Sequence, residues 1–531
     1  MTAPPHGETI RLRVGAIQLA QVARQKEANL EEAMRELASL VDAGADLVVL
    51  PELFASGYLF ADRDDVMPYA EESQGQTFER ITTVLNSSET IVVYGYVEHD
   101  PATDRLHNAA AVVRRGELLA RYRKIHPFLA DTTWAADGNE PPPRFAVGKL
   151  TATVAICADI EFPELFVNGS PRPFDLLCLP TAWVDERAPS ATWWLRARDF
   201  GVPIVAADLS GKEQGTQFSG GTCIIDDTGR VLIHRDEGTG SILWDLEVPL
   251  RADRVDTHAA PRPSLATSTW SFSPSELSSR AGSPLSPLPS GRIGLLAVAD
   301  ESDVLPESLT SMRFEHVVVA LPDSEALSED SSRGQRWLKT LSEIDAGRVA
   351  FVSWNPRLRQ VTVGAREEHH AFLITTYPLE IATLQLAEGG LTLALVPASQ
   401  VEKDPRTLLE ASVQGAHVAI VVGGITTAPV PRIPSKLALP PEVGTTSDTF
   451  DILRVRAGEA AVVVLHSGHP REQAHPGGVY GPDHITQPLA ESLLGEERSH
   501  ALITIEDDPN DPVRVALTQR SYLGRRKPWL Y

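Results

Sequence analysis

LTATVAICADIEFPE, residues 150–164, is an apolar run that ends abruptly in a cysteine. The β-branched residues before Cys157 predict a buried strand, and Pro163 marks the start of a helix a few residues later. A thiol at such a strand-to-helix turn is exposed at the edge of a sheet, where backbone N–H groups can face a reacting oxygen. Cys157 is therefore a candidate nucleophile, although a single buried cysteine is more often an inert small hydrophobe.

The length, composition and charge of the chain limit the class of protein. With 531 residues, 42% hydrophobic and 22% charged, it is a globular chain too long for one core, so we expect two domains of roughly 250 residues. The net charge of −23 argues against nucleic acid and anionic membranes as partners, because both attract basic surfaces.

The cysteines and the apolar runs indicate the compartment. The three cysteines show no CxxC spacing and no accompanying His cluster, so neither a disulfide framework nor a metal site is predicted. We interpret Cys178 and Cys223 as structural. The start of the chain lacks the apolar core of a signal peptide, and no apolar run approaches the roughly 20 residues that span a bilayer. A cytoplasmic protein without a cofactor is expected.

The first half alternates strand and helix patterns, which predicts an α/β sheet. Helical spacing is present over 30–41, with a stop at Gly44, and near 194–201. The predicted strands are 12–19, 46–50, 91–97, 109–113, 118–122, 175–179, 202–207, 217–225 and 230–233.

Two charged residues stand directly after predicted strands. Glu52 follows strand 46–50, and Lys124 follows strand 118–122. Taken alone, the glutamate could equally be a helix-terminal acid or a salt-bridge partner, and the lysine a surface charge. Together with Cys157 they supply a general base, a cation for a developing oxyanion and a nucleophile.

These residues resemble the nitrilase superfamily, the carbon–nitrogen hydrolases with a Glu-Lys-Cys triad. The resemblance covers residues from about 10 to 250 and includes several motifs in family order. The matching segments are Pro51-Glu52-Leu53-Phe54 with Gly57-Tyr58, Tyr122-Arg123-Lys124-Ile125-His126, Ile156-Cys157-Ala158-Asp159 with Phe162-Pro163-Glu164, Pro180-Thr181-Ala182, Arg196-Ala197-Arg198-Asp199 with Gly201-Val202-Pro203, and Phe218-Ser219-Gly220-Gly221.

The resemblance implies a fold and a mechanism. The fold would be an α-β-β-α sandwich. Cys157 would attack a carbonyl or nitrile carbon, Glu52 would act as the general base, and Lys124 would stabilise the tetrahedral intermediate. The backbone N–H of Ala158 would be a further oxyanion donor. Ammonia or an amine would leave, and water would then hydrolyse the thioester.

The sequence departs from the family pattern in two places. Ala158 stands where amidase-like members usually have an aromatic residue. Many members also carry a second glutamate in the loop after the lysine; here Asp131 is the nearest carboxylate, and Glu140 is the alternative. Aromatic residues near these motifs could line a substrate pocket or pack in the core. They are Tyr58, Phe128, Trp134 and Trp183.

The second half looks like a repeat of the first. Residues 1–250 form the predicted catalytic domain, and 251–291 are a Ser- and Pro-rich linker or wrapping arm. Residues 292–531 then resemble a second, diverged nitrilase-like domain. Its catalytic positions would be Asp323, Thr375 and Ala398, so it is expected to be inactive, and its end, 525–531, resembles a nitrilase-like tail. The alternative is an unrelated α/β domain.

The resemblance favours one activity and leaves others open. Cys-x-Asp followed by Phe-Pro-Glu resembles amidase-like members, which implies hydrolysis of a small linear amide. N-carbamoyl amide hydrolysis and nitrile hydrolysis are alternatives, and a non-catalytic binding or scaffold protein is an alternative of another class. The two domains are expected to pair as an intramolecular pseudo-dimer, with further homo-oligomerisation open.

Overall fold

The computed structural model describes two parts of the chain, each forming a compact unit. One unit lies within residues 9–249 and the other within 288–519. The linker predicted at 251–291 lies outside the described residues up to 287, as do Asp323 and the tail 525–531, so the domain boundaries stay a prediction. The described residues are 9–167, 174–184, 188–249, 288–298, 306, 309, 311–321, 332–355, 360–367, 373–378, 382–385, 391–413, 415–425, 430–431, 449–450, 452–467, 477–481, 491–493 and 500–519.

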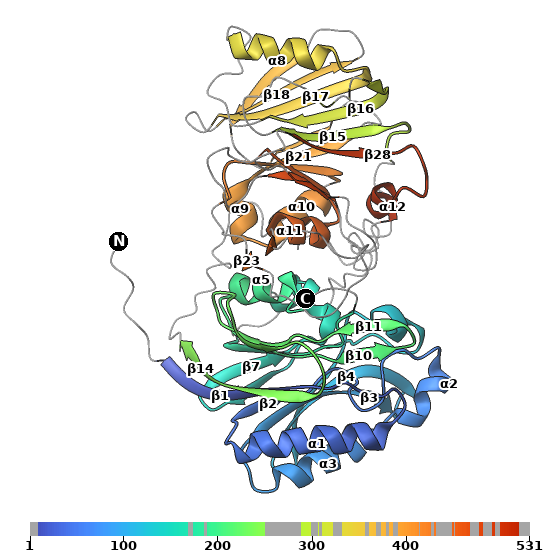
Figure 1. The fold of residues 1–531 in the computed structure, drawn as a ribbon, viewed down its shortest axis with the longest axis vertical. Coiled ribbons are helices and arrows are strands. Elements are labelled where there is room, and N and C mark those ends of the chain that lie inside the picture. Colours follow the sequence, from blue (N-terminus) through green and yellow to red (C-terminus); the bar gives the residue numbers. More distant parts are fainter. Residues whose placement is uncertain are drawn as a thin grey trace. The chain divides into compact units, whose positions relative to one another are not determined.

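The first unit contains two six-stranded mixed sheets that face each other (Figure 1). One sheet has the order β14 (Gly240–Pro249), β1 (Thr9–Gln18), β2 (Leu47–Val49), β3 (Ile91–Asp100), β4 (Arg105–Arg114), β5 (Glu117–Arg123). The other has the order β13 (Val231–Arg235), β12 (Thr222–Ile225), β9 (Ile204–Ala207), β8 (Leu176–Pro180), β7 (Leu150–Val154), β6 (Arg144–Val147). Strands β1 and β2 contact β8, β9 and β12, so the core lies between the sheets.

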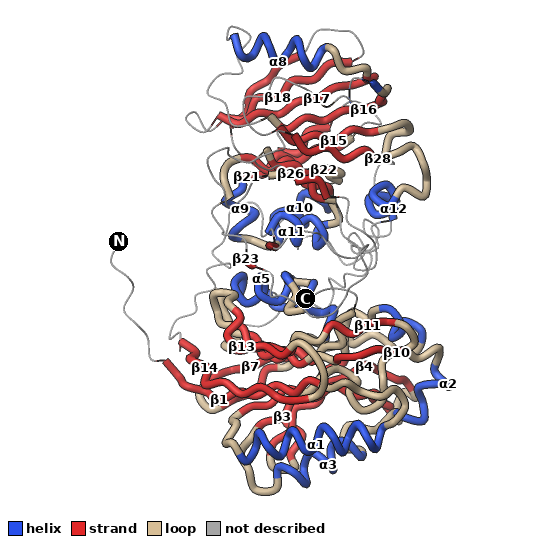
Figure 2. Tube along the Cα trace, viewed as in Figure 1, coloured by secondary structure: helices blue, strands red, loops and turns tan. Residues whose placement is uncertain are grey.

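Helices cover the outer faces and complete a four-layer α-β-β-α sandwich (Figure 2). Helices α1 (Lys26–Asp42) and α3 (Gln76–Leu85) pack on the first sheet, and α5 (Ala191–Phe200) packs on the second. Leu30, Met34 and Leu37, which predicted α1 from their spacing, lie on its buried face, and the helix ends just before Gly44, whose φ is +74°. The predicted fold class is confirmed for this half.

One predicted strand is wrong. The sequence predicts a single strand over 217–225, but the chain breaks at Gly220 and Gly221, whose φ angles of +65° and +77° are open mainly to glycine. The part before the break, β11 (Thr216–Ser219), forms a separate hairpin with β10 (Ser210–Glu213). The part after it, β12, pairs with β9 and β13 in the second sheet.

The second unit also contains two six-stranded sheets that face each other. One has the order β28 (His500–Ile505), β15 (Ile293–Val298), β16 (Phe314–Ala320), β17 (Ala346–Asn355), β18 (Gln360–Glu367), β19 (Leu373–Pro378). The other has the order β27 (Glu491–Leu493), β26 (Gly478–Tyr480), β25 (Val463–His466), β22 (Val418–Val422), β21 (Thr392–Pro397), β20 (Ala382–Gln385). Apolar residues from both sheets fill the space between them.

Helices again lie outside the sheets. Helix α8 (Ser332–Ser342) packs Trp337 and Leu341 against the first sheet of this unit. The second sheet is covered by α9 (Ala398–Lys403), α10 (Arg406–Val413) and α11 (Ile452–Ala460). The remaining elements of the chain are α2 (Arg63–Val66), α4 (Glu164–Val167), α12 (Pro512–Gln519), β23 (Val430–Pro431), β24 (Thr449–Phe450), and the 3-10 helices η1 (Met67–Tyr69), η2 (Leu129–Thr133) and η3 (Cys157–Glu161).

The second unit repeats the topology of the first. Each strand of the six-stranded sheets of one unit has a counterpart at the same place in the order of the other, and every neighbouring pair keeps its parallel or antiparallel sense. The first sheets agree pair by pair. The second sheets do so as well. The six-stranded sheets of the two units therefore share one strand order.

A buried arginine marks the same position in both units. Arg196 of α5 donates from Nε to the carbonyl of Ile160 at 2.9 Å, and Arg456 of α11 donates from Nε to the carbonyl of Val401 at 3.4 Å. Each arginine also pairs with the acid three residues later in its own helix. Such agreement in side-chain contacts goes beyond a shared strand order.

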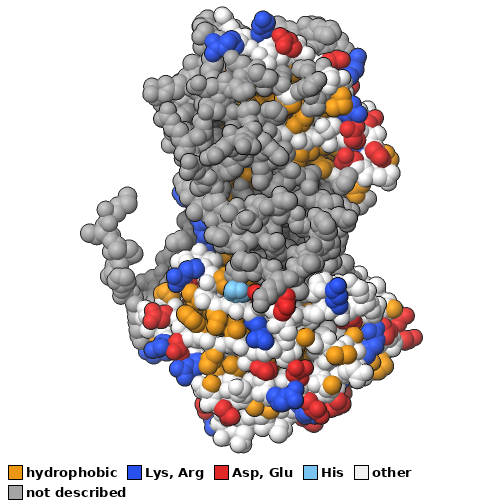
Figure 3. All heavy atoms as spheres, viewed as in Figure 1, with side chains coloured by type: hydrophobic (Ala, Val, Ile, Leu, Met, Phe, Trp, Pro, Cys, Tyr) orange, Lys and Arg blue, Asp and Glu red, His pale blue; other side chains and the backbone are white. Residues whose placement is uncertain are grey.

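The described parts of the chain contain no helix that is long and apolar enough to cross a membrane. On the face of the first unit seen in Figure 3, acidic and basic side chains lie interspersed among neutral ones.

Candidate active site

The carboxyl ends of strands from both sheets of the first unit meet at one place. Glu52 follows β2, Cys157 follows β7 and opens η3, and Lys124 follows β5, which runs in the same direction as β3. The backbone N–H of Glu52 donates to the carbonyl of Thr181 at 3.3 Å, which joins the end of β2 to the end of β8. Ligand sites of open α/β sheets lie beyond such strand ends.

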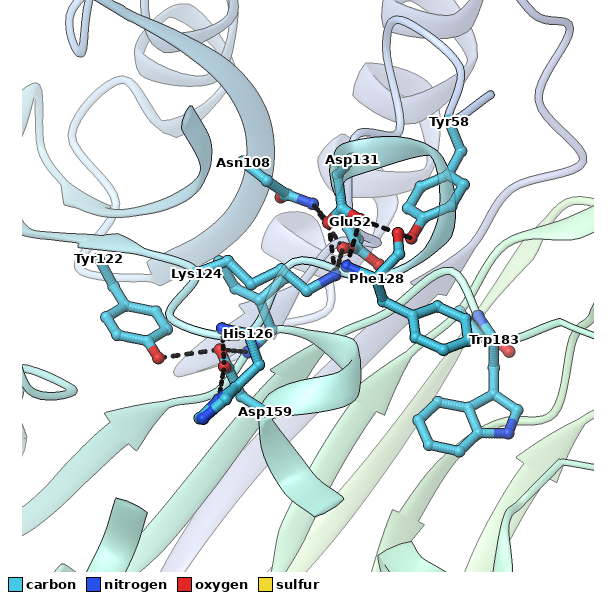
Figure 4. A network of polar contacts seen from close by, with 12 residues as sticks. Glu52, Tyr58, Asn108, Tyr122, Lys124, His126, Phe128, Asp131, Asp159 and Trp183 are labelled. Carbon is cyan, nitrogen blue, oxygen red and sulfur yellow. Dashed lines mark hydrogen bonds and ion pairs between the residues drawn. The ribbon is translucent and has the colours of Figure 1, made fainter. Parts of the chain in front are cut away.

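A buried ionic cluster contains three of the predicted residues (Figure 4). Lys124 Nζ lies 2.7 Å from Glu52 Oε1 and 2.8 Å from Asp131 Oδ2, and none of the three side chains is exposed. Asn108 Nδ2 donates to the same two oxygens at 2.7 Å and 3.0 Å. The other carboxylate oxygen of the glutamate, Oε2, has no hydrogen-bond partner among the described residues.

Burial and mutual charge set the protonation of this cluster. Burial raises the pKa of Glu52, Lys124 opposes this rise and Asp131 adds to it, and the net shift is upward. Burial alone would lower the pKa of Lys124, but the charges of Asp131 and Glu52 outweigh it, so that pKa is raised. The lysine therefore stays a cation, and the glutamate binds a proton more readily than an exposed carboxylate does.

Cys157 occupies a sharp, strained turn. Its φ is +45°, in the left-handed region that residues with a Cβ rarely adopt, and its side chain is buried. Burial raises the pKa of the thiol, the charge of Glu52 raises it further, and Lys124 opposes both. The thiol is therefore neutral at rest and needs a base. Ala158 follows in the first turn of η3, where backbone N–H groups lack partners within the helix.

Asp131 is held toward Lys124 by its own loop. Its Oδ1 accepts the backbone N–H of Phe128 and lies 3.3 Å from the hydroxyl of Tyr58, which is 2.8 Å from the carbonyl of Phe128. Glu140 is exposed. Of the two carboxylates considered from the sequence, only Asp131 lies at the lysine.

A second buried network links the lysine loop to the cysteine turn. Asp159 Oδ1 lies 2.8 Å from His126 Nδ1 and accepts the His126 backbone N–H at 3.1 Å. The other oxygen, Oδ2, accepts the hydroxyl of Tyr122 at 2.8 Å and the backbone N–H of Ile156 at 3.2 Å. The His126 ring stacks on Phe162 with centroids 3.7 Å apart. One carboxylate thus links the loop after Lys124 to the turn that carries Cys157.

Two glycines allow the backbone of the site to approach its neighbours. A Cβ at Gly95 would lie 2.6 Å from Glu52 Cα. A Cβ at Gly138 would lie 2.1 Å from the carbonyl oxygen of Arg123, and the Gly138 N–H donates to the carbonyl of Lys124 at 2.8 Å. Both the base and the lysine therefore rest against positions where a side chain does not fit.

The four predicted pocket residues are all buried. Tyr58 and Phe128 border the ionic cluster, as Figure 4 shows. Trp134 packs edge-on against Phe60, and Trp183 packs edge-on against a neighbouring tryptophan. Contact of these side chains with a substrate stays a prediction.

Two residues of the site were missed by sequence reasoning. Asn108 bridges the glutamate and Asp131 from the middle of β4, and Glu213 accepts the backbone N–H groups of Tyr58 and Leu59, each at 2.9 Å. The available signal for Asn108 was a polar residue inside the apolar run LHNAAAVV, where a buried amide requires partners. No comparable signal exists for Glu213.

The second unit has alanine where the first has the cysteine. In the first unit, Ala152 of β7 pairs with Leu176, the first residue of β8, and Cys157 comes five residues after Ala152. In the second unit, Leu393 of β21 pairs with Val418, the first residue of β22, and Ala398 comes five residues after Leu393. Thr375 lies within β19, whereas Lys124 follows β5.

This chain is similar to proteins of known family. The family model described as carbon-nitrogen hydrolase matches residues 13–250. A nitrilase from Pyrococcus abyssi is 31% identical over 222 residues, covering 42% of this chain and 84% of that protein. The chloroplastic omega-amidase of Arabidopsis thaliana is 27% identical over 274 residues, covering 48% of this chain and 72% of that protein. A solved amidase from Nesterenkonia sp. is 23% identical, with a TM-score of 0.40, covering 46% of this chain and 95% of that one.

Proposed function

This chain belongs to the carbon–nitrogen hydrolase family, the nitrilase superfamily, and we propose that it hydrolyses a small linear amide through a thioester on Cys157. One observation carries the proposal. Glu52 Oε1 is occupied by Lys124 and Asn108, whereas Oε2 has no partner among the described residues and the charge of Glu52 acts on the thiol. A carboxylate oxygen left open beside a neutral thiol is suited to take its proton.

Acylation begins with that proton transfer. Glu52 takes the proton of the thiol, and the sulfur of Cys157 bonds to the amide carbon, whose oxygen becomes an oxyanion. The oxyanion is stabilised by the ammonium of Lys124 and the backbone N–H of Ala158. The carbon–nitrogen bond then breaks, and the leaving nitrogen takes the proton from the glutamate. Ammonia or an amine departs, and a thioester remains.

Deacylation uses the same base. Glu52 takes a proton from water, whose oxygen attacks the thioester carbon and forms a second oxyanion. The carbon–sulfur bond breaks, the product leaves as a carboxylic acid, and the glutamate returns the proton to the sulfur of Cys157. Asp131 does not exchange protons in this scheme: it holds the charge of Lys124 at the site.

The amide is preferred over other substrates on two grounds. The Cys-x-Asp and Phe-Pro-Glu pattern at 157–164 resembles amidase-like members, and one relative, 27% identical over 274 residues, is an omega-amidase. N-carbamoyl amides and nitriles remain the alternatives. We further propose that the second unit is not catalytic, because Ala398 occupies the position of the nucleophile.

Release of ammonia across a panel of linear amides, N-carbamoyl compounds and nitriles tests the proposal. The blank is Cys157→Ala. The matched control is Cys178→Ala, which removes another buried thiol from the adjacent strand β8. We expect ammonia from at least one amide with the wild type and the control, and none with the blank. Equal release by wild type and blank on every compound would favour a binding or scaffold protein instead. Preference for nitriles over amides would overturn the choice of substrate alone.

A further inference from the structure

The three residues that follow β8 are each linked to a different part of the site. The carbonyl of Thr181 accepts the backbone N–H of Glu52 at 3.3 Å. The backbone N–H of Ala182 lowers the pKa of the Cys157 thiol. The backbone N–H of Trp183 donates to Asp208 Oδ1 at 2.8 Å. A short segment, residues 181–183, therefore contacts the base, acts on the nucleophile and is anchored at its end by a carboxyl group.

Asp208 is built into the sheet as an anchor. It follows β9, the strand beside β8, and it is fully buried. Its Oδ1 accepts a second backbone N–H, that of Leu209, at 2.9 Å. Its own backbone N–H donates to the hydroxyl of Thr222 at 2.8 Å. The carboxyl group therefore holds the chain after β8 and after β9, and the backbone of Asp208 is held by the first residue of β12.

The other oxygen of Asp208 is unusual. Oδ2 is buried and has no hydrogen-bond partner within the described part of the chain. No lysine, arginine or histidine among the described residues pairs with this carboxyl group, and the charge of Glu52 acts on it. An isolated buried carboxylate is far more costly than a buried neutral acid. Burial raises the pKa of Asp208 well above its usual value, and Glu52 adds to the rise, although the two N–H groups oppose it.

We propose that Asp208 is a positioning residue for acylation, acting as a neutral acid whose Oδ1 fixes residues 181–183 against Glu52 and Cys157. The proposal rests on the hydrolase function proposed above. It assigns the proton to Oδ2, which leaves Oδ1 to accept two N–H groups. It also avoids a further negative charge beside Glu52, which would raise the pKa of that base and make the Cys157 thiol harder to ionise.

Two substitutions separate positioning from charge. Asp208→Asn keeps the shape, the Oδ1 acceptor and the lack of charge. Asp208→Ala removes the acceptor and frees the Trp183 N–H. We expect Asp208→Asn to keep most of its kcat/KM with an unchanged pH profile, and Asp208→Ala to lose about 10²-fold, mainly in kcat, because small displacements of reacting groups cost about that much.

A second readout reports on the thiol itself. The Ala182 N–H lowers the pKa of Cys157. Once residues 181–183 are released, the pH dependence of Cys157 alkylation by iodoacetamide should move to higher pH in Asp208→Ala and stay in place in Asp208→Asn. Unfolding would instead remove the burial that raises the pKa of this thiol and move the profile to lower pH. The matched control is Asp226→Ala, which removes a carboxylate that also accepts two backbone N–H groups, at 3.0 Å and 2.9 Å, in the β12–β13 turn.

The outcomes are distinct. Retained activity in Asp208→Asn with loss in Asp208→Ala supports the proposal. Equal loss in both variants means that the charge is required, and wild-type kcat in Asp208→Ala means that the anchor is not; either overturns it. If Asp208→Ala does not fold, Asp208→Asn alone decides, because its inactivity contradicts a neutral acid. All of this requires an active wild type, so an inactive wild type indicates failure of the hydrolase function rather than of the anchor.

Discussion

Lys124 Nζ lies 2.7 Å from Glu52 Oε1, and neither side chain is exposed. Replacing the lysine by methionine would leave Glu52 and Asp131 buried together without their cation. Removing one partner of a buried ion pair typically lowers the free energy of unfolding by about 3–5 kcal/mol. We expect Lys124→Met to lose that much in the first unit, measured by urea-dependent hydrogen exchange of peptides from β1–β5, and to lose the proposed hydrolase activity.

An exposed ion pair provides the comparison for this variant. Arg63 Nη2 lies 2.8 Å from Asp104 Oδ1, with side-chain exposures of 40% and 78%. Exposed pairs contribute about 0–1 kcal/mol, so Arg63→Met should change the same measurement little. Similar losses in both variants would show that burial does not increase the contribution of the Glu52–Lys124 pair to the free energy of unfolding.

The pH dependence of activity should report on Glu52. The base must be ionised to take the thiol proton, and burial, with a contribution from Asp131, raises its pKa. The acid limb of kcat/KM should therefore lie above the ordinary glutamate value, and Asp131→Asn should move it to lower pH because one negative charge is gone. The control is Glu140→Gln, in the same loop but exposed. If Glu140→Gln moves the limb and Asp131→Asn does not, the assignment of the second acid is reversed.

Gly95 should be intolerant of a single added methyl group. A Cβ there would lie 2.6 Å from Glu52 Cα and 2.9 Å from the backbone nitrogen of Leu53, and backbone cannot yield as a side chain can. Gly95→Ala should displace the base, destabilise the first unit by about 1–3 kcal/mol and lower kcat/KM by about 10²-fold. Gly15→Ala is the matched control, because its Cβ would come too close only to the flexible end of Leu40, at 2.9 Å, and would lie at an ordinary 3.5 Å from the nearest backbone atom, the carbonyl oxygen of Ile242. Comparable activity of the two variants would contradict the argument.

The second unit should lose stability in acid through His316. Burial lowers the pKa of this histidine to about 4, and Arg348 adds to the effect. The unfolded chain, with a pKa of about 6.5, binds a proton that the folded chain rejects, so the stabilisation is present above pH 6.5 and falls as the pH drops toward 4. Calorimetric transitions at about pH 7 and pH 5 should differ less for His316→Phe than for the wild type. An unchanged difference would assign the acid sensitivity to other groups.

The sequence predicts the local part of this protein well and the long-range part poorly. Most of the predicted strands and α1 follow from periodicity, and each of Glu52, Lys124 and Cys157 stands out because it directly follows an apolar strand. Asn108 and Asp208 act through partners distant in the sequence, so their surroundings in the chain do not reveal which groups they meet. The break at Gly220 depends likewise on which strand each half pairs with.

The two units also share a short sequence segment that the strand pattern alone does not mark. RARDFGVPIV at 196–205 corresponds to RAGEAAVVVL at 456–465, and the structure gives both arginines the same contacts. Gly201 and Ala461 at equal places in these segments both have positive φ, +60° and +52°. The match is hard to recognise from the sequence because only three of the ten positions, Arg196, Ala197 and Val202, are identical in the two segments.

The backbone at the end of β7 differs from that at the end of β21, although the strand order around them is the same. Cys157 has φ of +45°, whereas Ala398 begins the regular helix α9 after Pro397. The architecture therefore permits a relaxed conformation at this corner, and the contorted one accompanies the thiol. Holding a non-glycine residue in such a conformation requires about 1–3 kcal/mol. The backbone strain therefore belongs to the reactive centre and not to the sheet architecture. The second unit, which has alanine at this position, does not carry it.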